Sequence, residues 1–94
     1  GPAYVFLFIE ALIDSGVHLG MPRELARKLT LQTILGSTQL VQQRKRHPAE
    51  LRNDVTSPGG TTAEGLLALE EGGFRATVMT AVIAAYERSL ELGG

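Results

Sequence analysis

The segment that most constrains this chain spans residues 3–15. Nearly every position in it is apolar, and Glu10 and Asp14, four residues apart, form one narrow polar stripe. Because consecutive residues point to all sides of a helix, a helix of this composition is buried almost all round. A chain of 94 residues buries proportionately little surface and could scarcely cover residues 6–9 by itself. We therefore expect a second copy of the chain to cover this helix.

The composition favours a single small helical domain over residues 1–94. Hydrophobic residues make up 44% of the chain but aromatic residues only 5%, so the core must consist of aliphatic side chains and alanine, as in packed helices. Cysteine is absent, which excludes disulfides and thiolate metal sites and makes the cytoplasm the expected location. The chain starts with Gly1-Pro2 instead of Met, so we expect further sequence upstream.

Charge and hydropathy argue against two classes of partner. A formal net charge of -1 provides no basic field for nucleic acid, and the run 44–46 is interpreted as the cationic end of a helix before Pro48. The apolar stretch 3–13 is interrupted by Glu10 and is much shorter than the roughly 20 residues that a membrane span needs. We expect neither nucleic acid nor a membrane as a partner.

Periodicity and helix-end signals predict an all-α fold. The expected helices cover residues 3–15 with Gly16 as C-cap, 21–46 with Gly36 at its middle, a short turn at 48–52, 61 to Gly72-Gly73, and 74–92. Between Lys28 and Arg44 no residue is charged, and Gly36 costs helix stability, which suggests close approach of another helix. Residues 53–60 are expected to form a loop.

The strongest candidate for a ligand-binding site lies in this predicted loop. Residues 54–62 read as a glycine-containing turn that enters a helix start, where unpaired backbone N–H groups and the helix dipole favour an anion. The hydroxyls of Ser57, Thr61 and Thr62 can add hydrogen bonds, and the absence of a P-loop lysine favours a carboxylate over a triphosphate. An equal alternative is that Thr61 is only an N-cap, in capping-box register with Glu64.

Other candidate sites are weak. His18, expected in a loop, and His47, before a proline, lack metal-ligand spacing, so we assign no metal. Glu10 and Asp14 are interpreted as a solvated or interface stripe. No G-x-G-x-x-G follows a strand, so no cofactor-binding residue is assigned to this chain.

The order of motifs resembles pyrroline-5-carboxylate reductase over essentially the whole chain. The matching blocks are residues 1–6, 19–23, Gln32-Thr33, 47–49, 55–62 (V-T-S-P-G-G-T-T), Leu69-Glu70, 73–75 and Arg88-Ser89. Ala63 departs from the isoleucine that is common in the family after the second threonine. The block at 55–62 is highly specific.

The resemblance implies an oxidoreductase of proline biosynthesis that reduces 1-pyrroline-5-carboxylate to L-proline with NADPH or NADH. Its N-terminal Rossmann domain would hold the cofactor, and this chain would be the C-terminal dimerisation domain, a homodimer with interleaved helices. In many members five dimers form a decamer. The substrate-binding residues implied are Val55, Ser57, Gly59, Gly60, Thr61 and Thr62, with main-chain N–H groups of Gly60 and Thr61 at the carboxylate and Thr62, the catalytic candidate, near the ring nitrogen.

Two alternatives stay open at this point. A non-catalytic helical dimerisation module needs the same buried helices but gives no reason for the loop at 57–62. A helical domain from another small-molecule dehydrogenase would carry an acid/base lysine or histidine on its central helix, and none is placed there.

Overall fold

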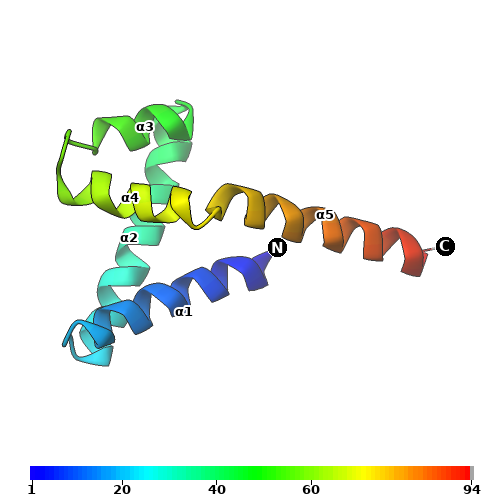
Figure 1. Cartoon of the computed structure of the whole chain (residues 1–94), viewed down its shortest axis with the longest axis horizontal. Helices are drawn as coiled ribbons and strands as arrows, with labels where there is room; N and C mark the ends of the chain where they lie inside the picture. The colour runs from blue at the N-terminus through cyan, green and yellow to red at the C-terminus, as the bar shows by residue number, and fades with distance from the viewer. Residues whose placement is uncertain (94) are drawn as a thin grey trace. The chain divides into compact units, whose positions relative to one another are not determined.

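The computed structural model describes residues 1–93, and within them it contains five α-helices and no strand. The helices are α1 (Pro2–His18), α2 (Arg23–Arg44), α3 (Pro48–Asp54), α4 (Thr61–Glu71) and α5 (Phe74–Gly93) (Figure 1). The all-α class expected from the sequence is confirmed. The chain divides into two compact units, Gly1–Pro48 with α1 and α2, and a second that begins at Ala49 and holds α4 and α5.

In the first unit, α1 and α2 pack at the end where a short turn joins them, and they diverge from there (Figure 1). A Cβ atom added to Gly16 would lie 3.0 Å from the Cβ of Ala26, so glycine allows the two helices to approach. Gly16 is therefore inside α1, and the prediction that it ends the helix is wrong. The stop is Gly20, with φ of 101°, whose N–H donates to the Val17 carbonyl at 3.0 Å.

The buried residues of the first unit follow from helical spacing. Ala26 and Thr30 stand four apart on α2 and are 2% and 8% exposed, so they lie on one face of that helix. Near the turn, Arg23 Nη1 lies 3.2 Å from Asp14 Oδ1 and links α2 to α1, although both side chains are exposed. The α2 helix ends at Arg44, two residues before the predicted end, because Lys45 adopts the left-handed conformation with φ of 52°.

The second unit carries the loop of interest between α3 and α4. Glycines end α4 as predicted: Gly73 has φ of 74° and its N–H donates to the Glu70 carbonyl at 3.0 Å. The Gly73 carbonyl then accepts from the Thr77 N–H at 2.9 Å, which starts α5. Arg75 Nε lies 2.9 Å from Glu70 Oε1 across this junction. No residue of α5 is buried.

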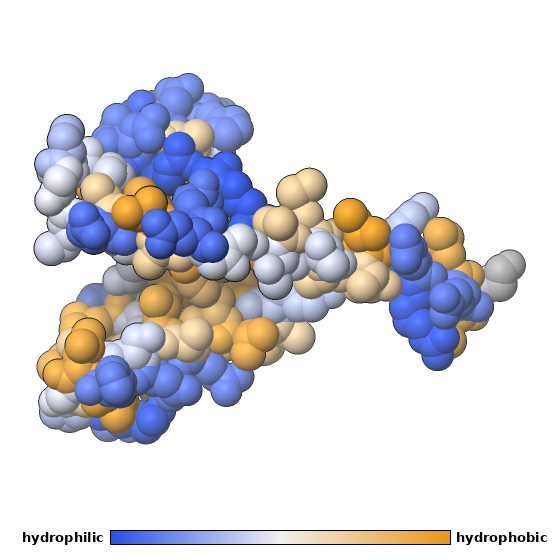
Figure 2. Space-filling model, viewed as in Figure 1, coloured by the Kyte–Doolittle hydropathy of each residue, from blue (hydrophilic) through white to orange (hydrophobic). Residues whose placement is uncertain are grey.

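Much of the apolar surface is uncovered in a single chain. Among residues 1–93, Ala26 is the only buried hydrophobic residue, and Phe6 and Leu7 on α1 are 62% and 67% exposed. Figure 2 shows hydrophobic surface over α1 and again along α5. None of the helices in residues 1–93 combines the length and the apolar character that crossing a membrane requires.

Candidate anion-binding site

The loop at residues 55–60 is tied to the end of α3 by Thr56. The Thr56 hydroxyl donates to the Arg52 carbonyl at 2.6 Å, and the Thr56 N–H donates to the Asn53 carbonyl at 3.1 Å. Carbonyls in the last turn of a helix have no intrahelical partner. One residue therefore satisfies two of them, and its side chain is half-buried while its neighbours are exposed.

The next four residues form a closed β-turn. The Gly60 N–H donates to the Ser57 carbonyl at 3.0 Å, with Pro58 at the second position and Gly59 at the third. Gly59 has φ of 70°, which a type II turn requires at that position and which glycine adopts without a steric penalty. A Cβ at Gly60 would lie 3.3 Å from both the Cβ and the carbonyl oxygen of Ser57, so a side chain there would crowd Ser57.

The turn leads directly into α4. Gly60 is the N-cap residue, its carbonyl accepts from the Glu64 N–H at 3.2 Å, and no side chain caps the helix. The alternative that Thr61 is the N-cap is therefore wrong, because Thr61 is already the first helical residue. Within residues 1–93, the N–H groups of Thr61, Thr62 and Ala63 have no acceptor. Such donors, at the positive end of the helix dipole, favour an anion.

Three side chains with hydroxyl groups lie near these N–H donors in the sequence. Ser57, Thr61 and Thr62 are exposed, and none of their hydroxyls has a hydrogen-bond partner among the described residues. Gly60 differs from the expectation, because its N–H is already donated within the turn. The open main-chain donors begin at Thr61. Val55, at the other end of the loop, is 65% exposed and offers an apolar contact.

Glu64 also lies in the first turn of α4, and it is exposed. A carboxylate side chain near the helix start opposes a second anion through like-charge repulsion, although exposed charges are screened by salt. Any preference for an anion at this end of α4 therefore has to come from the backbone N–H groups and the hydroxyls, against the charge of Glu64.

The hydrogen bonds from Thr56 to α3 were not predicted from the sequence. The signal available was modest: a threonine just past the end of a short helix can return its hydroxyl to the carbonyl four residues earlier. That signal could not say whether the hydroxyl points to the helix or into solvent.

The remaining candidates form no second site. His18 is the last residue of α1, not a loop residue as expected. Within residues 1–93, no group of three His, Asp or Glu side chains is placed to hold a metal ion. Asp14 of the predicted polar stripe pairs with Arg23.

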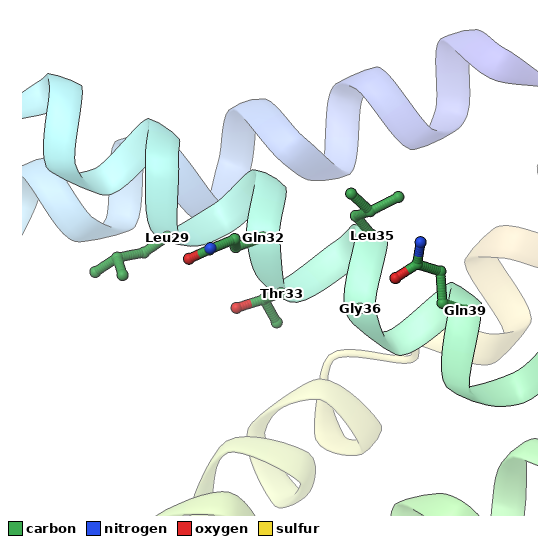
Figure 3. Close-up of a pocket in the computed structure, with 6 residues that line it drawn as sticks. All are labelled: Leu29, Gln32, Thr33, Leu35, Gly36 and Gln39. Carbon is green, nitrogen blue, oxygen red and sulfur yellow. The ribbon is translucent and has the colours of Figure 1, made fainter.

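An open groove lies on α2 around Gly36. Its lining residues are Leu29, Gln32, Thr33, Leu35, Gly36 and Gln39 (Figure 3). Apart from neighbouring atoms of α2 itself, no described atom lies within 4 Å of a Cβ placed at Gly36. Within the first unit, α1 thus makes no close approach to α2 at Gly36.

Residues 1–92 match the family model described as pyrroline-5-carboxylate reductase dimerisation. The chain belongs to this family. The chain is also similar in sequence to known pyrroline-5-carboxylate reductases. It is 56% identical to that of Synechocystis over 93 residues and 59% identical to that of Arabidopsis thaliana over 92 residues. These alignments cover 99% and 98% of the chain but only 35% and 33% of the two relatives.

Solved structures of the family have the same fold. The pyrroline carboxylate reductase of Plasmodium falciparum, with NADP bound, superposes with a TM-score of 0.97 at 51% identity, over 100% of this chain and 38% of that one. The pyrroline-5-carboxylate reductase of Coxiella burnetii gives 0.94 at 42% identity, over 98% and 34%. The chain thus spans about a third of the length of these reductases, and the dimerisation family expected from its motifs is confirmed.

Proposed function

We propose that this chain is the C-terminal domain of an enzyme that reduces 1-pyrroline-5-carboxylate to L-proline with NADPH or NADH. Membership of the dimerisation family supports the parent activity. The observation that carries the role of this domain is the first turn of α4, whose open N–H groups follow the turn that begins at the exposed Ser57. The substrate is a small carboxylate, the kind of anion that such a turn favours.

The loop binds the substrate through its carboxylate. The hydroxyl of Ser57 and the N–H of Thr61 donate to the carboxylate oxygens. Gly59 and Gly60 have no side chains, so the substrate can approach the main chain closely. The exposed Val55 supplies an apolar contact for the ring.

Thr62 serves the ring nitrogen. The imine accepts hydride well when its nitrogen is protonated, so a hydroxyl at that atom helps most as imine becomes amine. Thr62 is the second residue of α4, where its hydroxyl is exposed and has no partner among the described residues. This domain orients the substrate and does little bond chemistry itself.

The described residues carry no dinucleotide-binding fingerprint. Residues 1–93 contain no strand, and the glycine turn at 57–60 lacks the spacing that cradles a pyrophosphate. The nicotinamide, which supplies a hydride to the C=N carbon, is therefore held mainly by sequence outside this chain. The NADP-bound relative of Plasmodium falciparum supports nicotinamide use by the parent enzyme.

In this proposal the active unit is a homodimer. Five such dimers assemble as a decamer. The substrate lies between the cofactor domain of one subunit and the helical domain of its partner. The apolar surfaces of α1 and α5, uncovered in one chain, support self-association.

The test is Ser57→Ala in the full-length reductase. The variant loses a hydrogen bond to a charged group that is made about equally in ground and transition states, so KM should rise by an amount equivalent to roughly 1.5–3 kcal/mol with little change in kcat. Ser89→Ala, on α5, is the matched control and should leave KM unchanged. An unchanged KM in Ser57→Ala would favour the non-catalytic dimerisation module instead.

A further inference from the structure

We infer that Thr56 is a positioning residue: its hydroxyl bond to α3 holds Ser57 in place for the substrate carboxylate. This inference rests on the proposed function of the loop and adds to it a residue that does not itself touch the substrate. The bond is short, 2.6 Å from the Thr56 hydroxyl to the Arg52 carbonyl, and it is half-buried.

Ser57 lies between two hydrogen-bonded turns and has no side-chain bond of its own among the described residues. On one side, Thr56 is fixed to α3 through its hydroxyl and through its N–H to the Asn53 carbonyl at 3.1 Å. On the other side, the Ser57 carbonyl accepts from the Gly60 N–H at 3.0 Å. The orientation of the Ser57 hydroxyl therefore depends on both ends of this short segment being held.

The two ends are not equally secure. The Gly60 end continues into the backbone bonds of α4, which begin with the Glu64 N–H on the Gly60 carbonyl at 3.2 Å. The α3 end depends on a helix of seven residues, too short to be stable without support from its ends. Removing the Thr56 hydroxyl frees the Arg52 carbonyl, loosens this end and lets Ser57 turn away.

Loss of the Thr56 hydroxyl should not move Thr62. Thr62 lies in α4, beyond the N-cap at Gly60, and its position is set by the helix backbone. Loss of the Thr56 hydroxyl should therefore weaken carboxylate binding and spare the step at the ring nitrogen.

The test uses the full-length reductase with Thr56→Val, which keeps the branched shape and removes the hydroxyl. We expect KM for 1-pyrroline-5-carboxylate to rise about three- to tenfold, the range for one lost hydrogen bond, with kcat within about twofold of wild type. Thr56→Ser restores the hydroxyl and should return KM to within about twofold. Thr38→Val is the matched control, because the Thr38 hydroxyl makes the same kind of bond, 2.9 Å to the Ile34 carbonyl, within α2.

A double-variant cycle separates positioning from general damage. If Thr56 acts through Ser57, adding Thr56→Val to Ser57→Ala should raise KM little further, whereas independent effects multiply. If the two substitutions raise KM by factors that multiply in the double variant, Thr56 does not act through Ser57. The role of Thr56 is also overturned if Thr56→Val leaves KM unchanged while Ser57→Ala raises it. An unchanged KM in Ser57→Ala overturns the proposed carboxylate site itself. If neither Thr56→Val nor Thr56→Ala folds, Thr56 is a stability residue and the inference fails.

Discussion

Two threonines stand side by side at the start of α4, and the helix gives them different surroundings. Thr61 directly follows the N-cap Gly60 and lies next to the turn that holds Ser57, while Thr62 is one position further into the helix. Successive helical residues point about 100° apart, so the two side chains point in different directions. Under the proposed function, the Thr61 N–H would donate to the substrate carboxylate and the Thr62 hydroxyl to the ring nitrogen.

The residue-scale prediction is that Thr62→Ala in the full-length reductase lowers kcat and leaves KM largely intact. A bond at nitrogen matters most as that atom changes from imine to amine, while the carboxylate contacts remain. Thr62→Ser keeps the hydroxyl and should recover most of the activity, which steady-state kinetics will measure. A kcat within about twofold of wild type in Thr62→Ala, equivalent to under about 0.4 kcal/mol, would mean that Thr62 only packs or fills the turn.

The sequence predicted where the loop enters α4 but not the hydrogen bonds of the loop. The step from Gly60 to a helix start at Thr61 could be predicted, since glycines, a proline and a hydroxyl run give a local signal. Which N–H groups are left open could not, because the pairing of Gly60 with Ser57 depends on turn geometry. The orientation of Thr56 toward Arg52 depends on the same geometry.

At the scale of the elements, Gly16 should be essential to the α1–α2 pair. In Gly16→Ala the new Cβ would meet that of Ala26 at 3.0 Å, and Ala26 is buried and has no rotamer that moves it away. We expect this overpacking to lower the free energy of unfolding by about 1–3 kcal/mol. Replacing a glycine inside a helix by alanine offsets a smaller part of that loss, because alanine has the higher helix propensity. Thermal or urea unfolding of the domain measures the change.

Gly65→Ala in α4 is the matched control, because nothing lies within 4 Å of a Cβ at that position. It should stabilise by about 0.5–1 kcal/mol through helix propensity alone. If Gly16→Ala stabilises the domain as much as Gly65→Ala, the helices have room to move apart and the contact is not tight.

The same pair of helices shows what sequence could tell about elements. The apolar pattern predicted that α1 and α2 exist, and their expected bounds lie within a few residues of those observed. The end of α1 was misplaced because Gly16 and Gly20 are both plausible stops from sequence. Only the packing against Ala26 assigns Gly16 to the helix interior and leaves Gly20 as the turn.

At the scale of the whole molecule, the 94 residues alone should not reduce 1-pyrroline-5-carboxylate with either nicotinamide. The described residues hold no strand and no pyrophosphate-binding fingerprint, and the proposed function places the hydride donor mainly on the domain outside this chain. The full-length enzyme should show turnover, followed by loss of the reduced nicotinamide absorbance. Cofactor-dependent reduction by the 94-residue chain would show that the division of labour between the two domains is wrong.

The last prediction is that the domain is an obligate dimer. Ala26 is the only buried hydrophobic residue among residues 1–93, and ordering a backbone costs about 1–2 kcal/mol per residue. So little apolar surface is fully buried in one chain that we expect the apolar faces of α1 and α5 to be covered in the stable fold. Light scattering should give at least twice the chain mass of 10.1 kDa, and the unfolding temperature should rise with protein concentration.

Leu7→Glu distinguishes a covered α1 from an uncovered one. Leu7 is 67% exposed in one chain, so in a monomer this surface change should alter stability by no more than about 0.5 kcal/mol. In a dimer that buries Leu7, an unpaired carboxylate would cost more than about 3 kcal/mol and prevent assembly. Leu7→Met keeps the apolar surface and should remain dimeric. A well-folded monomer at micromolar concentration, or a Leu7→Glu variant as stable as wild type, would contradict the prediction, because α1 would then be stable in contact with water.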